Sequence, residues 1–381
     1  MPMVGMDTHE HATDDAIVFG PQHVDLSRSP LRGSVTEETY VLGAFNPGLT
    51  RLPNGNVLMM VRVAEALRRP VREEHVLAIR WNAGRYLIDR FPRASVNDKD
   101  PRQLQLSQHH YMTLILTSIS WLLPVELSPD GSRVLKAHYD RIIQPDRSYQ
   151  EYGVEDARIS RIGDRWYMTT CSVSAERHCT TLHVSDNGLD YRLEGVVLDH
   201  QNKDMLLFEG KVRDKFMALT RPLGEVYFAY PPDSDFLPGP SIQLASSPDA
   251  LHWRPLEAPG IRPRRHSPSS MKVGGGTPPI LTSKGWLELY HGVEVRGVVG
   301  AYRTFWALLD RDDPSRILHL ADNEPLLEAR PELSPELDPH RYVSDIVFST
   351  GIVEDGEDYI VASGEDDLAC RITRFPKARF E

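Results

Sequence analysis

The sequence has few of the residues that build disulfide scaffolds, zinc sites or membrane spans. Only three of its 381 residues are cysteines, Cys171, Cys179 and Cys370, and their spacing fits neither a disulfide framework nor a zinc motif. We expect buried free thiols in a reducing compartment. No apolar run approaches a membrane-spanning length, and the acidic N-terminus lacks the basic and apolar segments of a signal peptide. We therefore predict a cytoplasmic protein without a membrane partner.

Positive charge and helical periodicity are also scarce. The formal net charge of −11 argues against nucleic acid as the main partner, because neutralising phosphates needs a basic face. The chain has neither the Gly-Lys-Ser/Thr ending of a Walker loop nor a dinucleotide-binding fingerprint. Its best candidate for an amphipathic helix is the stretch 62–72, which Pro70 would end. Helices are therefore expected to contribute little.

The sequence does contain a pattern that recurs five times: an apolar run, a tight turn, a second apolar run and then a polar residue. The turns are Asn54-Gly55, Gly163-Asp164, Arg213-Asp214, Lys284-Gly285 and Asp355-Gly356. Turn residues between β-rich runs indicate hairpins, and a repeated hairpin indicates a radial array. Polar residues that end corresponding strands would then converge on a central axis. These residues are Arg62, Ser172, Arg221, His291 and the stretch 363–367.

The spacing of the five copies is uneven, with a long insertion between the first two. A β-sandwich of ordinary hairpins is therefore the alternative to a radial array. The stretch 102–121 in the insertion is rich in His, Gln and aromatic residues. It is expected either to shape a ligand subsite or to be plain strand over 111–123, and the pattern favours the strand.

Two adjacent acids, Glu155 and Asp156, precede Arg158 at the start of an apolar strand. Because neighbouring side chains of a strand point to opposite faces, one of the two acids is expected to point inward, but not both equally. An inward carboxyl in a sugar-sized cavity is typical of a general acid whose proton is retained by burial and neighbours. A turn carboxylate paired with Arg158 is the alternative.

A second segment, 272–280, reads Lys-Val-Gly-Gly-Gly-Thr-Pro-Pro-Ile. Three glycines let the backbone pass close to a ligand and expose N–H groups to an anion, although a tight start of a strand would also use them. With Lys272 before the glycines and His291 at the end of the next strand, an anion or polyol pocket is predicted. The stretch 203–221 repeats the arrangement, with an acidic start and a strand that ends at Arg221.

Taken in order, these motifs resemble glycoside hydrolase family 130, the inverting mannoside phosphorylases and mannosidases with a five-bladed β-propeller. The resemblance covers roughly 46–367. It rests on Asn46-Pro47 with Arg62, Gly-Val-Glu-Asp-Ala-Arg, Lys203-Asp204 through Lys211, Arg221-Pro222, Lys-Val-Gly-Gly-Gly-Thr-Pro-Pro, Tyr-His-Gly-Val and Asp310–Pro314. It implies an all-β fold, a five-bladed β-propeller with insertions, over 31–381 as a single catalytic domain. Residues 1–30 would be an N-terminal tail and lead-in.

The resemblance also implies roles for individual residues. Asp156 would be the catalytic acid. The set that resembles the phosphate binders is Arg221, Lys272, His291 and Tyr302. The set that resembles the sugar binders is Asn46, Arg62, Arg158, Lys211 and Asp367, of which Asp367 would hold the sugar left of the cleaved bond.

Some positions depart from the family pattern. Ala157 stands where the family usually has Pro, and the stretch 208–211 is shortened. Glu365 and Asp366 add negative charge beside Asp367. The family's additional phosphate-binding Arg, between its third and fourth blades, would fall near Ser246-Ser247, which counts against the phosphate assignment.

The resemblance implies phosphorolysis of a β-mannoside by inorganic phosphate to give α-mannose 1-phosphate. The expected substrates are β-1,2-mannobiose or short β-1,2-mannooligosaccharides, with phosphate as co-substrate and no metal or other cofactor. The leaving sugar is open, and a homo-oligomer is compatible with the sequence. One alternative is an inverting β-1,2-mannosidase with Glu209, Glu225 or Glu294 as base. A non-catalytic glycan-binding propeller is the other, and Asp156 beside Arg158 argues against it.

Overall fold

The structure is a computed structural model that describes residues 14–106, 113–223, 231–234, 237, 239–256 and 260–380. Strands dominate it, which confirms the all-β class, and the helices of the described residues are short 3-10 turns. None of these helices is long and apolar enough to span a membrane. The 3-10 turns are η1 (Pro21–His23), η2 (Leu26–Arg28), η3 (Arg93–Ser95), η4 (Tyr139–Arg141), η5 (Ser148–Gln150), η6 (Pro331–Leu333), η7 (Pro335–His340) and η8 (Lys377–Phe380).

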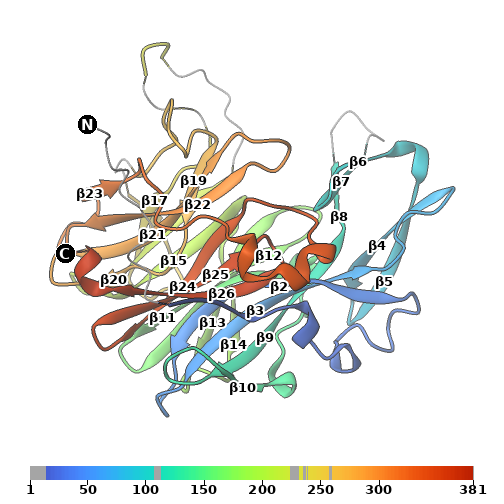
Figure 1. The fold of residues 1–381 in the computed structure, drawn as a ribbon, viewed down its shortest axis with the longest axis horizontal. Helices are drawn as coiled ribbons and strands as arrows, with labels where there is room; N and C mark the ends of the chain where they lie inside the picture. Colours follow the sequence, from blue (N-terminus) through green and yellow to red (C-terminus); the bar gives the residue numbers. More distant parts are fainter. Residues whose placement is uncertain are drawn as a thin grey trace, which may run out of the picture.

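Most strands belong to five antiparallel units, numbered in chain order (Figure 1). A single parallel pair, Gly153 with Ser120, joins units one and two into one eight-stranded sheet. Unit one contains β2 (Thr39–Arg51), β3 (Val57–Leu67), β9 (Ser118–Leu127) and β10 (Val134–Ala137). Unit two contains β11 (Gly153–Ile162), β12 (Arg165–Val173), β13 (His178–Ser185) and β14 (Arg192–Leu198). Unit three contains β15 (Asn202–Val212), β16 (Lys215–Pro222), β17 (Gln243–Ser247) and β18 (Arg254–Pro255).

Units four and five follow the same plan. Unit four contains β19 (Lys272–Gly275), β20 (Ile280–Leu281), β21 (Trp286–Glu294), β22 (Ala301–Leu309) and β23 (Ile317–Ala321). Unit five contains β24 (Val347–Asp355), β25 (Asp358–Glu365) and β26 (Ala369–Pro376), completed by β1 (Asp14–Phe19) from the start of the chain. The pairing of β1 with β26 joins the two ends of the described chain in one sheet.

All five predicted hairpin turns are confirmed. They join β2 to β3, β11 to β12, β15 to β16, β20 to β21, and β24 to β25. The third turn has no glycine, yet Arg213 and Asp214 both adopt left-handed backbone with φ of 48° and 61°. Two residues of positive φ match the twist of a two-residue hairpin, which explains how this turn works without glycine.

The hydrophobic core is divided into clusters that lie between neighbouring units. Met59 and Val61 on one face of β3 pack in a cluster with Ile360 of unit five, whereas Leu58 and Met60 on its other face pack against unit two. Further clusters join unit two to three, three to four, and four to five. Burial on both faces explains why the apolar run of β3 is continuous instead of alternating. This ring of clusters does not fit a two-layered sandwich.

The first strands of the units meet in the middle of the molecule. Strand β2 contacts β11, β11 contacts β15, β15 contacts β19, and β24 contacts β2. Four of these first strands, β2, β11, β15 and β24, carry a β-bulge or irregularity, as their register shifts show. The ends of the first strands therefore surround a common centre.

One expectation differs from the structure. The stretch 62–72 is not a helix, because β3 continues to Leu67 with both of its faces against other strands. Within the expected tail and lead-in, residues 14–19 form β1, and Asp15 forms ion pairs with Arg371 at 2.6 Å and with Arg330 at 3.0 Å. Residues 1–13 lie outside the described part of the chain.

The insertion between β3 and β9 projects to one side of the five units (Figure 1). It contains β4 (His75–Asn82), β5 (Arg85–Pro92), β6 (Val96–Asp100), β7 (Gln103–Leu106) and β8 (Thr113–Leu116). A small core of its own holds it together, including Val76, Leu104 and Ile115. Strand was expected over 111–123, and β8 and β9 confirm it for the described residues; 107–112 lie outside them.

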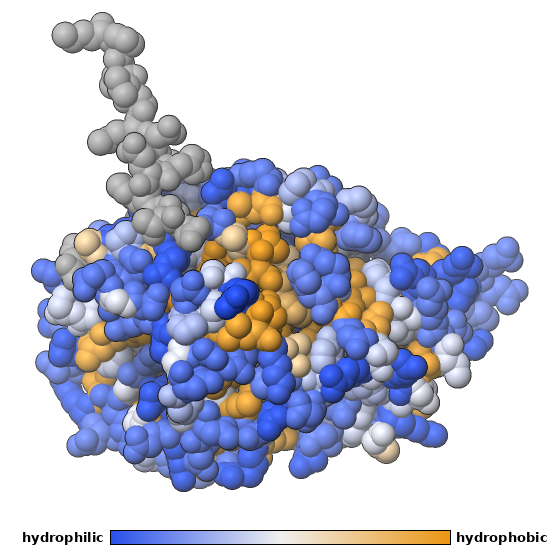
Figure 2. Space-filling view, turned by 60° about the horizontal axis from the view of Figure 1, so that its bottom comes forward, coloured by the Kyte–Doolittle hydropathy of each residue, from blue (hydrophilic) through white to orange (hydrophobic). Residues whose placement is uncertain are grey.

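The hydrophilic surface and the free thiols are those that the amino-acid composition predicts. Figure 2 shows a face covered mostly by hydrophilic residues, with apolar side chains gathered across its middle. Cys171, Cys179 and Cys370 are buried and free, as expected. The chain is therefore held by its cores and ion pairs, without disulfides.

Candidate active site

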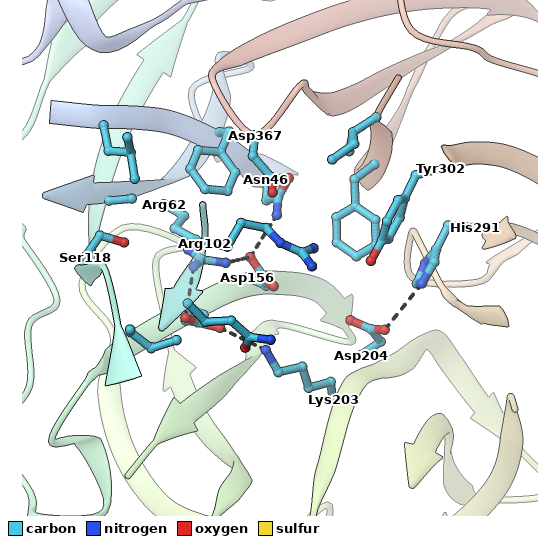
Figure 3. A pocket seen from close by; sticks show the side chains of 18 of the residues that line it. Asn46, Arg62, Arg102, Ser118, Asp156, Lys203, Asp204, His291, Tyr302 and Asp367 are labelled. Carbon is cyan, nitrogen blue, oxygen red and sulfur yellow. Dashed lines mark hydrogen bonds and ion pairs between the residues drawn. The ribbon is translucent and has the colours of Figure 1, made fainter. Parts of the chain in front are cut away.

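A cavity of about 330 Å³ lies where the first strands meet (Figure 3). Its volume falls at the lower end of the roughly 300–1,000 Å³ that is usual for small-molecule sites. Every unit contributes to its wall, and so does the insertion. The charged and polar residues of the wall include Asn46, Arg62, Arg102, Glu155, Asp156, Lys203, Asp204, Arg221, Lys272, His291, Tyr302 and Asp367.

The bulges of three first strands aim polar side chains into this cavity. Asn46, Asp156 and Asp204 occupy corresponding places in β2, β11 and β15, and their φ angles of 47°, 52° and 53° are left-handed. A bulge breaks the strict alternation of side chains and re-aims them. Glu155 and Asp156 therefore both line the cavity, so the expectation that only one of them points inward was wrong.

Asp156 lies in a strongly cationic setting. Its Oδ1 accepts hydrogen bonds from Arg62 Nη1 at 2.9 Å and from Asn46 Nδ2 at 3.0 Å. Burial alone would raise the pKa of Asp156, but Arg62, Arg158 and Lys203 outweigh burial and lower the pKa to about 2. The expectation that neighbours retain its proton was therefore wrong for the unliganded protein, in which the carboxyl is ionised at neutral pH.

Glu155 is bound from two sides. Arg62 Nη2 donates to Oε1 at 2.9 Å, and Lys203 Nζ donates to Oε2 at 3.2 Å. Although burial opposes it, these two cations lower the pKa of Glu155, and Glu155 in turn raises the pKa of Lys203 against the effect of burial. Lys203 was part of a sequence motif but was not assigned to the site.

Asp204 organises the opposite side of the cavity. It lies 3.0 Å from Arg221 Nη1, 3.5 Å from Arg158 Nη2 and 3.8 Å from His291 Nε2. Arg221 Nη1 also lies 3.1 Å from His291 Nε2, and since a guanidinium only donates, this nitrogen accepts and the imidazole carries its proton on Nδ1. Burial, with Arg221 and Lys272, holds the pKa of His291 well below its usual range. His291 is therefore neutral.

Lys272 and Tyr302 lie in contact in the wall of the cavity. The Lys272 ammonium lies 4.8 Å from the centre of the Tyr302 ring. Burial lowers the pKa of Lys272, and Lys272 lowers the pKa of Tyr302 although burial opposes it. No carboxylate of the described residues forms an ion pair with Lys272, so its charge is available to a ligand.

Two predicted sugar-binding residues do not line the cavity. Lys211 lies eight positions beyond Lys203 on β15, roughly 25 Å away at the usual rise of a strand. It is exposed, and its ammonium lies 4.4 Å from the Phe216 ring centre. Arg158 is buried beneath the cavity, where it donates to the backbone oxygens of Gly276 at 2.6 Å and Asp156 at 2.9 Å. Arg158 therefore supports the site from below.

The structure brings the other predicted residues together in the one cavity: Asn46, Arg62, Asp156, Arg221, Lys272, His291, Tyr302 and Asp367. Their binding roles stay predictions. Burial raises the pKa of Asp367, although Arg62 and Arg102 oppose the rise. Residues that sequence reasoning missed include Arg102 and Asp204. The residue type of Asp204 could have indicated it, because Asn and Asp are the non-glycine residues that most readily adopt the left-handed backbone of a bulge.

A family model described as beta-1,4-mannooligosaccharide phosphorylase matches residues 110–378. The chain belongs to glycoside hydrolase family 130. The match covers the strand with Asp156 and the strands with the cationic residues opposite it, whereas most of unit one lies before it. The resemblance of the motifs to this family is thereby confirmed.

Relatives in family 130 match over most of their length. A beta-1,2-mannobiose phosphorylase of Listeria innocua serovar 6a is 32% identical over 336 residues, which are 85% of this chain and 86% of that protein. A 1,2-beta-oligomannan phosphorylase of a Thermoanaerobacter species is 32% identical over 64% of this chain and 74% of its own length. The solved structure of a Listeria innocua beta-1,2-mannobiose phosphorylase in complex with beta-1,2-mannobiose has a TM-score of 0.77, at 28% identity, and covers 96% of this chain and 98% of that one.

Proposed function

We propose that the protein is an inverting mannoside phosphorylase that cleaves β-1,2-mannobiose or short β-1,2-mannooligosaccharides with inorganic phosphate and releases α-mannose 1-phosphate. One observation carries the proposal: Asp156 faces, across a sugar-sized cavity, an anion-binding side that contains Arg221, Lys272 and Tyr302. A phosphate ion removed from water needs such charge-assisted donors. The β-1,2-mannoside specificity of the relatives named above supports the choice of substrate.

The proposed reaction is a single displacement. A phosphate oxygen attacks the anomeric carbon of the mannosyl unit while the bond from that carbon to the bridging oxygen breaks. The bridging oxygen receives a proton that derives from Asp156, relayed through a sugar hydroxyl as the family resemblance implies. Attack from the opposite face turns the β-linkage into an α-phosphate ester. Asn46, Arg62 and Asp367 would hold the mannosyl unit, and no metal takes part.

Because the unliganded carboxyl is ionised, the proton has to arrive with the substrates. The monoanion of phosphate carries a proton. Negative charge bound opposite Asp156 also raises its affinity for that proton, since a like charge disfavours the ionised form. The ion pair with Arg62 thus keeps Asp156 unprotonated until phosphate is bound.

Hydrolysis is the weaker reading because the described residues offer no suitable base. An inverting hydrolase needs a second carboxylate with room for water between the two. Glu209 and Glu294 do not line the cavity; Glu209 accepts from the Arg161 amide at 3.3 Å, and Glu294 pairs with Arg296 at 3.2 Å. Glu225 lies outside the described residues. Of the other carboxylates in the wall, Glu155 and Asp204 are held by cations, and Asp367 is assigned to the mannosyl unit.

For the architecture, we propose that the five units are the blades of a five-bladed β-propeller, with the β4–β8 insertion attached to the first blade. The cores between successive units and the contacts among first strands support this arrangement. In such a propeller β1 would close the ring by completing the last blade. The three free thiols support a reducing, cytoplasmic compartment.

Product analysis tests the proposed reaction. The protein is incubated with β-1,2-mannobiose and phosphate, and the products are followed by phosphorus and proton NMR. The α-anomer of mannose 1-phosphate, formed in equal amount with free mannose, is expected. A β-anomer would exclude inversion, and free mannose without a phosphate ester would exclude phosphorolysis.

A further inference from the structure

Arg102 enters the cavity from outside the five units. It lies just before β7 in the insertion, and it lines the same cavity as Asp156 and Lys272. Figure 3 shows its side chain between Arg62 and Tyr302, in the middle of the labelled residues. No sequence motif points to Arg102, because its place depends on how the insertion folds back over unit one.

Asp100 fixes the orientation of this arginine. Arg102 Nε donates to Asp100 Oδ1 at 3.1 Å, and Nη2 donates to Oδ2 at 3.0 Å. Asp100 is itself buried, and the backbone N–H of Arg102 also donates to its Oδ1 at 2.9 Å. Since one edge of the planar guanidinium is held in this two-point contact, the Nη1 edge is the one left for the cavity.

The anion-binding side offers too few free hydrogen-bond donors for phosphate without a further residue. Arg221 is paired with Asp204, and His291 is neutral, so Lys272 is the one member of that set that no described carboxylate neutralises. A phosphate group carries about 1.5 to 2 negative charges at neutral pH. The positive charge of Arg102 acts on both Lys272 and Tyr302, since it contributes to lowering the pKa of each, so it lies within electrostatic reach of this side.

We propose that Arg102 is a phosphate-binding residue supplied by the insertion. This inference rests on the proposed function. Its guanidinium binds Asp100 with one edge and phosphate oxygens with the other, and it closes the anion subsite opposite Lys272. A neutral sugar would gain less from this position, because planar charged forks bind oxyanions more strongly than hydroxyl groups.

The test compares substitutions at two arginines of the insertion. For Arg102→Gln we expect KM for phosphate to rise roughly 10- to 100-fold, the usual effect of losing a charge-assisted hydrogen bond, while KM for β-1,2-mannobiose stays near the wild-type value. Arg102→Lys keeps the positive charge but loses the planar guanidinium. Its KM for phosphate should lie between those of the wild type and Arg102→Gln. Arg90→Gln, at an exposed site on β5 of the same insertion, should match the wild type in both constants.

Calorimetric titration with inorganic phosphate alone provides a second readout, in which Arg102→Gln should bind phosphate more weakly than Arg90→Gln. Unchanged phosphate binding would overturn the inference, and so would a rise in KM for mannobiose alone, which would place Arg102 at a sugar subsite. Both results would leave the proposed phosphorylase in place. A wild-type protein whose turnover does not need phosphate would instead refute the proposed function itself.

Discussion

Arg62 Nη1 lies 2.9 Å from Asp156 Oδ1, and this partly buried pair lines the cavity. The same guanidinium also binds Glu155, so one arginine aligns two carboxylates that a bulge has turned to the same side. Such an arrangement fixes the orientation of Asp156 and keeps it ionised in the absence of phosphate. The relation between this pair and the anion-binding side is the core of the proposed mechanism.

Replacing the acid tests its role most simply. Asp156→Asn keeps the size of the side chain and one oxygen that can accept from Asn46 or Arg62. An amide, however, cannot supply a proton as the carboxyl does. Loss of general-acid help typically costs roughly 10²–10⁴-fold in rate, so we expect kcat to fall by roughly 10²-fold or more. Thermal unfolding should stay cooperative. Near-wild-type turnover would remove Asp156 from this role, and Glu155 would be tested next.

Lys272 should affect phosphate far more than the mannoside. For Lys272→Ala we expect KM for phosphate to rise by roughly one to two decades, since a hydrogen bond to a charged group contributes about 1.5–3 kcal/mol. Lys211→Ala is the matched control, because Lys211 is exposed at the far end of β15 and should leave both KM values unchanged. Equal losses toward phosphate and mannobiose in Lys272→Ala would mean that the lysine only supports the shape of the cavity.

Asp204 is expected to be a positioning residue that also stabilises the fold. Its side chain is 2% exposed and bridges Arg158 and Arg221, and removing one partner of a buried ion pair costs roughly 3–5 kcal/mol. Asp204→Asn should therefore unfold at clearly lower denaturant concentration and bind phosphate more weakly. In Asp199→Asn only an exposed pair with Arg177 is lost, and stability should hardly change. Equal stability of the two variants would contradict this account.

The features of the fold and of the site that could be predicted from the sequence are those that short-range patterns determine. Asn54-Gly55 and the other turns mark their hairpins directly, and His291 and Arg221 were found because they lie near the ends of strands that follow such turns. The bulge at Asp156 could not be predicted from the alternation of side chains. One extra residue in a strand moves the side chains that follow it to the opposite face. The motif ending at Lys211 correctly marked β15, but only its first residues, Lys203 and Asp204, reach the cavity.

Longer-range relations could not be derived in this way. Arg102 reaches the site because the insertion packs on its own small core and turns back toward unit one. Pairing of β1 with β26 joins segments from opposite ends of the chain, and no local pattern in 14–19 announces its partner. Such contacts depend on the closure of the whole fold.

Glu288 should make stability depend on pH. It is fully buried in unit four, and no described residue donates a hydrogen bond to either carboxyl oxygen. Burial raises its pKa from 4.5 to about 8. The folded protein therefore binds this proton more tightly than the unfolded chain, so its contribution is greatest below pH 4.5 and is lost as pH rises to about 8.

Glu288→Gln has no such proton to lose. We expect its unfolding free energy to fall less between pH 4.5 and about 8 than that of the wild type. Denaturant unfolding at several pH values measures this difference. Parallel pH profiles for the two proteins would show that folding does not raise the pKa of Glu288.

The most direct measurement of the central claim is the dependence of mannobiose cleavage on inorganic phosphate. The protein is freed of phosphate by dialysis, and the release of mannose from β-1,2-mannobiose is followed with and without added phosphate. We predict that cleavage without phosphate is negligible and that it rises with phosphate concentration to saturation, with one mannose 1-phosphate formed per bond broken. Release of mannose at the same rate in both samples would contradict phosphorolysis and establish a hydrolase in its place.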